Sequence, residues 1–336
     1  MITPKIVVLL LAATLSWTVE PVPVCATVPD LGDLVRAVGG DEVTVTVFAR
    51  GGDDPHFVEP RPSFAKALAR AELVVSVGLE LEIGWLPVVV GQARNPRLAA
   101  GQPGWFEAAS AVSPLGIPAG TVDRSHGDVH AGGNPHFLSD PVCGVQVARA
   151  LAGRLGTLRP EGASGFTARY RTFALEVGRR LLGPTVVQRA GEAAVLAALE
   201  QDALAPVIGD GADLGGWLAR LRPARGARVI VDHDLWPYVA RRFALEVVGF
   251  LEPKPGIPPT TRHLADLVER SRGRSVRAIL AVPYFDRRTA AVVAEGLTIP
   301  VVVLAHQVGA TSGASDWLSM LDHNVGQLAT ALGGNP

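Results

Sequence analysis

Short apolar runs alternate with helical patterns along most of this chain, and no other feature of the sequence restricts its fold as strongly. Before residue 140 the apolar runs are "VPVCATV", "EVTVTVFA" and "ELVVSVG"; after about residue 225 they are "ARVIVDHD", "EVVGFLE", "VRAILAVP" and "PVVVLAHQ". Helical stretches such as "DLGDLVRAVGG" and "DRRTAAVVAEGL" lie between them. This alternation is typical of parallel α/β units. We therefore predict an α/β protein with two lobes, each built on a parallel sheet.

The two sets of strands are separated by a long helical pattern. Asp140 is a suitable N-cap, Pro141 fits the first helical position, and helical periodicity continues to about residue 182. The segment "RPEGASG" interrupts it and predicts a bend or break. We expect an N-terminal lobe over residues 21–139, a long rigid linking helix over 140–182 and a C-terminal lobe over 183–336.

The first twenty residues have the pattern of an export signal. Lys5 precedes the apolar run "IVVLLLAATLSW", which is too short to span a bilayer and suits the core of a signal peptide. No Leu-x-x-Cys lipobox follows. We therefore predict a signal peptide over residues 1–20, cleaved to leave a soluble periplasmic protein.

Composition excludes several classes of function. Acidic and basic residues are interspersed and the net charge is −1, so neither nucleic acid nor a membrane surface is an expected partner. We expect a monomer. The two cysteines, Cys25 and Cys143, could form one bridge in an oxidising compartment. The interpretation that we prefer is two small buried apolar side chains.

A repeated motif points to the function. "GGDDPHFVEP" and "GGNPHFLSDP" both place Pro-His-Phe behind two glycines, at His56 and His136. His233 and His306 each follow an apolar strand, and the carboxyl ends of parallel strands are where open α/β sheets bind ligands. Two of these histidines precede the linking helix and two follow it, so a cleft between the lobes could collect all four. Imidazole ligands favour zinc over manganese, which prefers carboxylates.

The sequence gives weaker evidence of metal binding for the other four histidines. His263 and His323 lie inside helical patterns and are expected to be ordinary helix residues. His126 and His130 belong to the Gly-rich stretch "DRSHGDVHAGGNPHF", which is either a flexible surface loop or a loop that gathers metal with low affinity. We predict that residues 123–133 are dispensable for tight binding.

Several blocks resemble, in order and with matching separations, the zinc/manganese solute-binding proteins of bacterial ABC importers. They are "ATVPDLGDLVRAVGGDEVTVTVFARGGDDPHFVEPRPS", "GLELEIGWLPVVV", "GGNPHFLSDP", "HDLWPYVARRFAL" and "VVLAHQVGATSGASDWLSMLDHNVGQL". The resemblance implies a two-lobed extracytoplasmic receptor with a rigid helix, which binds one divalent ion, most simply Zn2+, between its lobes and delivers it to an ABC permease. The family's first three ligands fall on His56, His136 and His233. Its last, usually Asp, falls on His306.

Four neutral imidazoles leave the charge of the ion uncompensated, so a nearby carboxylate is expected to accept a ring N–H from a ligand. The candidates are Glu59, Asp232, Asp234 and Asp286, and Asp286 is also the next choice for the fourth ligand.

Two other functions remain to be weighed. A zinc hydrolase would keep an open position for water beside about three ligands, but the chain has no His-Glu-x-x-His motif and no evident general base. Dinucleotide binding is suggested by "VIGDGADLGGW" with Asp232 further on, but its third glycine is one position late and no long strand precedes it. We therefore predict a metal receptor rather than an enzyme.

Overall fold

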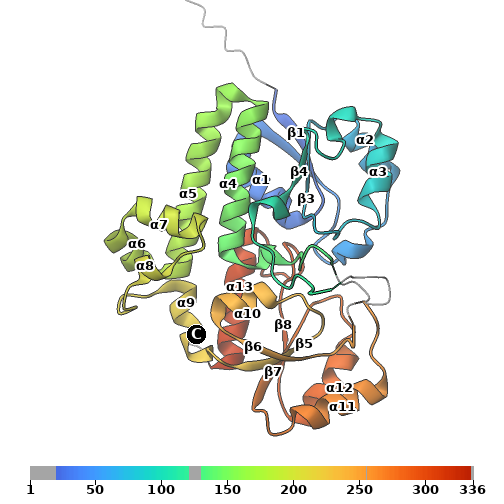
Figure 1. The fold of residues 1–336 in the computed structure, drawn as a ribbon, viewed down its shortest axis with the longest axis vertical. Helices are drawn as coiled ribbons and strands as arrows, with labels where there is room; N and C mark the ends of the chain where they lie inside the picture. Colours follow the sequence, from blue (N-terminus) through green and yellow to red (C-terminus); the bar gives the residue numbers. More distant parts are fainter. Residues whose placement is uncertain (1–19, 121–129, 255, 334–336) are drawn as a thin grey trace, which may run out of the picture.

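Two four-stranded parallel sheets organise the structure, a computed structural model that describes residues 20–120, 130–254 and 256–333 (Figure 1). The first sheet has the order β2-β1-β3-β4 and the second β6-β5-β7-β8. This confirms the predicted α/β class with two parallel sheets. The strands are β1 (Val22–Ala26), β2 (Val43–Val47), β3 (Leu73–Ser76), β4 (Trp105–Glu107), β5 (Arg228–Val231), β6 (Glu246–Phe250), β7 (Val276–Ala281) and β8 (Val301–Val303).

The burial of each strand follows its sequence. β1 and β3 lie inside the first sheet, and all four residues of β3, "LVVS", are buried, as expected where helices cover both faces. β2, "VTVTV", is an edge strand whose threonines are exposed and whose valines are partly buried. β4 is the one strand that the apolar pattern did not predict, because it has only three residues and only Phe106 among them is buried.

Proline begins many of the helices, where its missing N–H costs no hydrogen bond. The principal helices are α1 (Pro29–Gly39), α2 (Pro62–Leu68), α3 (Leu86–Ala93), α4 (Pro141–Leu158), α5 (Ala163–Leu182), α6 (Pro184–Ala190), α7 (Glu192–Glu200), α8 (Ala205–Ile208), α9 (Gly216–Arg220), α10 (Pro237–Phe243), α11 (Thr261–Ser271), α12 (Arg287–Leu297) and α13 (Trp317–Leu332). Among the described residues, no helix is both long enough and apolar enough to cross a membrane.

The linking segment differs from a single helix. α4 and α5 lie side by side and are joined by a 3-10 turn at Pro160–Gly162 (Figure 1). Arg159 precedes this proline and has φ −136° and ψ 80°, outside the helical region, as the steric clash with a following proline favours. The break that "RPEGASG" predicted is therefore a full reversal, and the expected long helix is a pair of packed helices.

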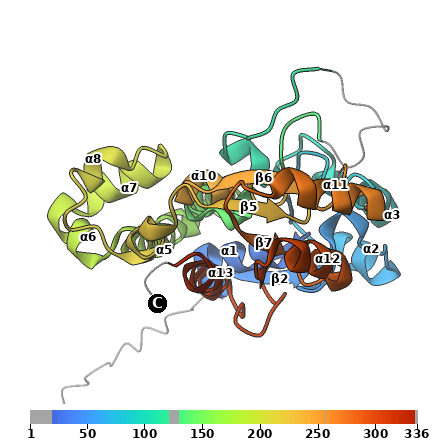
Figure 2. The same cartoon turned by 90° about the horizontal axis from the view of Figure 1, so that it is seen from below.

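A group of short helices follows α5. α6, α7 and α8 project beside α5, away from the two sheets (Figure 2). Gly209 follows α8 rather than a strand, so the glycine-rich stretch lacks the strand that a dinucleotide-binding turn requires. Gly183 adopts φ +87°, and a Cβ there would meet the Cα of Gly215 at 2.7 Å, so the chain crosses itself closely at this point.

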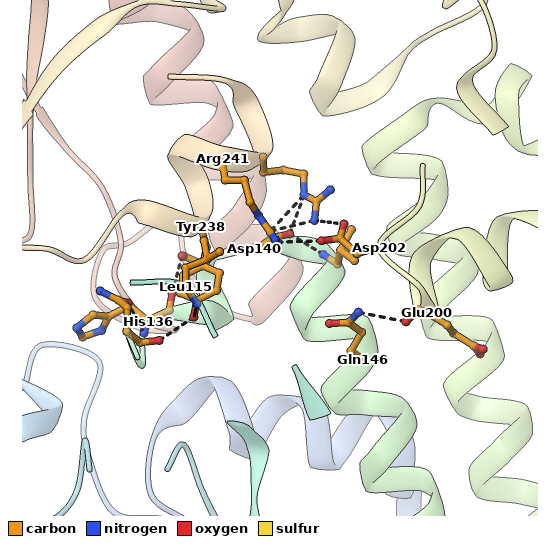
Figure 3. Close-up of polar contacts among 12 residues, drawn as sticks. Leu115, His136, Asp140, Gln146, Glu200, Asp202, Tyr238 and Arg241 are labelled. Atoms are coloured by element: carbon orange, nitrogen blue, oxygen red, sulfur yellow. Dashed lines mark hydrogen bonds and ion pairs between the residues drawn. The ribbon is translucent and has the colours of Figure 1, made fainter. Parts of the chain in front are cut away.

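A buried ion-pair network joins the start of α4 to α10 (Figure 3). Asp140 has no exposed surface; its carboxylate caps α4 at the N–H of Val142 and accepts a hydrogen bond from Arg242 Nε at 2.9 Å. Arg241 contacts the same carboxylate at 3.2 Å, and both arginines also contact Asp202. This network fixes α4 against the second lobe.

A second junction joins the loops at the carboxyl ends of β2 and β8. The Gln307 side-chain amide nitrogen lies 2.6, 3.2 and 2.9 Å from the carbonyl oxygens of Arg50, Gly51 and Asp53. A Cβ on Gly51 would meet the carbonyl carbon of Gly309 at 2.1 Å, so only glycine fits at this contact. The two lobes are therefore closely packed here.

Both cysteines are buried free thiols, in agreement with the preferred interpretation. Burial raises the pKa of the Cys25 thiol to about 12.

Candidate metal centre

His56 is held in a 3-10 turn, Pro55–Phe57, beyond the end of β2. The Asp54 carboxylate caps this turn at the His56 N–H (3.0 Å) and accepts a hydrogen bond from the ring Nδ1 at 2.8 Å. Burial raises the pKa of Asp54, but its bonds to His56 outweigh this and lower the pKa overall. Because Nδ1 is engaged, the Nε2 lone pair of a neutral His56 is free to bind a metal.

His136 occupies the corresponding place in the second Pro-His-Phe motif, directly before the turn Phe137–Ser139. Its backbone N–H donates to the side chain of Asn134 at 2.9 Å, and its carbonyl accepts from the hydroxyl of Ser139 at 2.8 Å. Burial, followed by the charges of the neighbouring histidines, lowers the pKa of His136 well below its usual range. The imidazole is therefore neutral near pH 7, as a metal ligand must be.

His233 follows β5 in the second lobe. Its Nδ1 donates to the Glu252 carboxylate at 2.8 Å. Burial lowers the pKa of His233, but the hydrogen bond and charge of Glu252 outweigh burial and raise the pKa overall. Glu252 lies just past β6, the strand next to β5, so the two strand ends bring these side chains together.

The three rings converge, although they come from both lobes. One ring nitrogen of each of His56, His136 and His233 lies within 4.8 Å of those of the other two. The ring centroids are 5.4 Å apart for His56 and His136, 5.9 Å for His56 and His233, and 5.8 Å for His136 and His233. Three nitrogen donors at this separation can share one metal ion after small movements, because zinc–nitrogen bonds are about 2.0–2.1 Å.

His306 is not in this cluster. Its Nε2 donates to the Asp53 carbonyl at 3.1 Å, so a neutral ring carries its lone pair on Nδ1. Nδ1 is buried and has no hydrogen-bond partner among the described residues. His306 and His136 line the same small cavity of about 30 Å³ between the lobes. Burial lowers the pKa of His306 to about 4, so this ring is also neutral.

His130 lies closer to the cluster than its glycine-rich sequence suggested. Its Nε2 is 3.3 Å from the Nε2 of His56, and the two rings stack with centroids 5.4 Å apart. Burial, then the charges of His56 and His233, lower the pKa of His130 to about 4, while a hydrogen bond to the backbone of Leu79 opposes this. His126 lies outside the described residues.

Among the described contacts, none of the four carboxylates expected from the sequence accepts a ring N–H of these histidines. Asp234 accepts the side-chain amide of Asn134 instead. Asp286 is exposed, caps α12 and pairs with Arg288, and Glu59 is exposed as well. Asp232 is buried and accepts the N–H groups of His233 and Val282, which holds the loop but not a ring nitrogen. The ring partners are Asp54 and Glu252. A signal for Asp54 existed, since an Asp two residues before a histidine can form an Asx turn.

The other two histidines lie in helices, as expected. His263 is in α11 and bonds to the Phe250 carbonyl at 3.1 Å, and His323 is in α13.

The chain is similar to known metal-uptake proteins. The family model of the periplasmic zinc-uptake complex component A matches residues 24–179 and 216–331. The high-affinity zinc uptake system protein ZnuA of Yersinia pestis is 23% identical over 293 residues, covering 82% of this chain and 80% of that protein. A putative metal-binding protein of Treponema pallidum is 22% identical, covering 93% of this chain and 87% of that protein.

Solved structures share the fold. A crystal structure of ZnuA has a TM-score of 0.69 and 22% identity, covering 93% of this chain and all of that chain. A manganese-bound mutant of a periplasmic metal-binding protein of Candidatus Liberibacter asiaticus has a TM-score of 0.66 and 16% identity, with coverage of 93% and 100%.

Proposed function

This chain belongs to the periplasmic zinc-uptake complex component A family, and we propose that it captures Zn2+ with His56, His136 and His233 and delivers it to an ABC permease. The family is one of metal-binding solute receptors in uptake systems, not of enzymes, so the hydrolase alternative is set aside. The observation that carries the proposal is the convergence of three imidazoles from two lobes.

The chemistry of the donors supports zinc as the cargo. All three clustered donors are imidazole nitrogens, which zinc binds readily, whereas manganese sites favour carboxylate oxygens. The nearest carboxylates, Asp54 and Glu252, accept ring N–H groups and so orient the rings rather than compete with them for the ion.

Metal analysis tests the choice of cargo. Protein stripped of metal and dialysed against equal concentrations of Zn2+ and Mn2+ is expected to retain one zinc per chain and little manganese, as measured by elemental analysis. Retention of manganese in preference to zinc would contradict the proposal.

Periplasmic action requires export, and we propose that residues 1–20 are the signal. They lie, except for Glu20, outside the described residues. We also propose that the protein acts as a monomer, with the lobes divided at residues 139 and 182.

Two side chains can supply a fourth ligand and close the site. The 3.3 Å separation of the His130 and His56 nitrogens supports His130, because two ligands of a tetrahedral zinc ion are about 3.3 Å apart at these bond lengths. The buried, unpartnered Nδ1 of His306 supports the prediction made from the sequence, but His306 is not among the histidines whose ring nitrogens lie within 4.8 Å of one another.

We expect His130→Ala to lower the zinc affinity by about 100- to 1000-fold, as for the loss of one ligand, and His306→Ala to change it by less than about threefold. Competition titration against a chelator of known affinity measures both variants in parallel. The reverse order would show that His306 is the fourth ligand and that residues 123–133 are dispensable, as the sequence predicts.

A further inference from the structure

One amide side chain joins the loops that carry two of the proposed ligands. Asn134 is 8% exposed, and its Oδ1 accepts the backbone N–H of His136 at 2.9 Å. Its Nδ2 donates to the carbonyl of Asp234 at 2.5 Å and to the Asp234 carboxylate at 3.2 Å. Asp234 directly follows His233. The two halves of one amide group therefore connect the His136 loop to the His233 loop.

The backbone of Asn134 is fixed as firmly as its side chain. Its N–H donates to the Leu115 carbonyl at 2.7 Å, and its carbonyl accepts the hydroxyl of Tyr238 at 2.7 Å. The same hydroxyl accepts the N–H of Leu115 at 2.9 Å (Figure 3). Tyr238 has no exposed surface and lies on α10, in the second lobe. Because the backbone is held in this way, rotation of the Asn134 amide would break its side-chain hydrogen bonds to both loops.

We propose that Asn134, held by Tyr238, is a positioning residue that sets the separation of the His136 and His233 rings before the ion arrives. The inference rests on the proposed function, because it assigns these rings as ligands. Ligands that are already in place lose little conformational freedom on binding, so preorganisation increases affinity and favours ions that fit the preset geometry. Asp54 and Glu252 orient single rings, whereas Asn134 relates one ligand loop to the other.

The chain offers a matched control at Asn95. Its Oδ1 also accepts the N–H two residues on, from Arg97, and its Nδ2 also donates to two oxygens, the carbonyls of Leu68 and Ala71. Asn95 lies between α3 and β4 in the first lobe, and its side-chain hydrogen bonds join residues outside the histidine cluster. Loss of a comparable set of hydrogen bonds can therefore be separated from loss of the connection between ligand loops.

Zinc affinity and the visible absorption of the Co2+-substituted protein test the inference. Asn134→Ala is expected to weaken zinc binding by about 10- to 100-fold and to weaken or shift the tetrahedral Co2+ bands, while Asn95→Ala leaves both nearly unchanged. Asn134→Asp keeps the acceptor for His136 but loses the donor to Asp234, so it is expected to show a similar loss. Tyr238→Phe, which removes only the hydroxyl, should show a smaller loss in the same direction.

Circular dichroism of the metal-free variants establishes that each is folded, and Asn134→Asp or Tyr238→Phe decides the matter if Asn134→Ala does not fold. Affinity and Co2+ bands unchanged from the parent in the folded Asn134 variants would overturn the positioning role alone. A parent protein that binds no zinc would instead overturn the proposed function.

Discussion

Replacement of His136 by alanine is expected to lower the affinity for zinc by about 100- to 1000-fold. Structural zinc sites in zinc-finger peptides have apparent binding free energies of about 10–16 kcal/mol, or roughly 2.5–4 kcal/mol for each of four ligands. Burial lowers the pKa of His136 well below its usual range, so this ring loses little affinity to proton competition at pH 7. Competition titration with a chelator measures the change.

His263→Ala is the control for this variant, because His263 lies on α11 and bonds to the Phe250 carbonyl rather than to the cluster. It should bind zinc as the parent does. If His136→Ala retained the affinity of the parent, the converging rings would not be the site of tight binding.

Replacement of Arg242 by methionine is expected to destabilise the protein by about 3 kcal/mol. Asp140 is fully buried, and Arg242 is its most buried cationic partner, with a side chain 9% exposed. Removal of one member of a buried ion pair leaves an uncompensated charge, which costs about 3–5 kcal/mol. Arg241 remains within 3.2 Å of the carboxylate, so the loss should fall at the low end of this range. Urea unfolding followed by circular dichroism measures it.

A double variant isolates the reason for that loss. Asp140→Asn keeps an oxygen to cap α4 but removes the charge, so combining it with Arg242→Met should recover part of the stability. Arg228→Ala, which breaks an exposed pair with Glu246, should cost less than about 1 kcal/mol. Equal losses for the Arg228 and Arg242 variants would show that burial of Asp140 does not determine the effect.

Most strands could be predicted because the apolar pattern within each strand reflects how that strand is buried. The buried central strand β3 begins with an apolar run, Leu-Val-Val. The edge strand β2 instead alternates valine with exposed threonine. β4 was missed because it lies at the edge of its sheet, where burial is partial, and because three residues carry no periodicity. The reversal between α4 and α5 was predicted only as a break, since a proline ends a helix but does not determine the direction of the next one.

Part of the candidate metal centre could likewise be predicted from the sequence, and part could not. The repeated Pro-His-Phe and the strand-end position of His233 drew attention to the three rings that the structure brings together. Glu252 was not predicted, because its relation to His233 depends on the order of β5 and β6 in the sheet. The glycine-rich sequence around His130 indicates an irregular backbone, which left open a flexible surface loop or a loop that gathers metal with low affinity. Tertiary contacts bring its ring to His56.

The bonds from Gln307 to the loop of His56 also bear on how long an ion stays bound. This side chain links the loop of His306 to the carbonyls of residues 50, 51 and 53, so the two loops move together. Separating them requires these contacts to break, so we expect them to slow the escape of an ion held by His56. Dwell time on the free protein should therefore be long. Under the proposed function, a membrane partner that separates these loops would shorten the dwell time, so the receiver would control unloading.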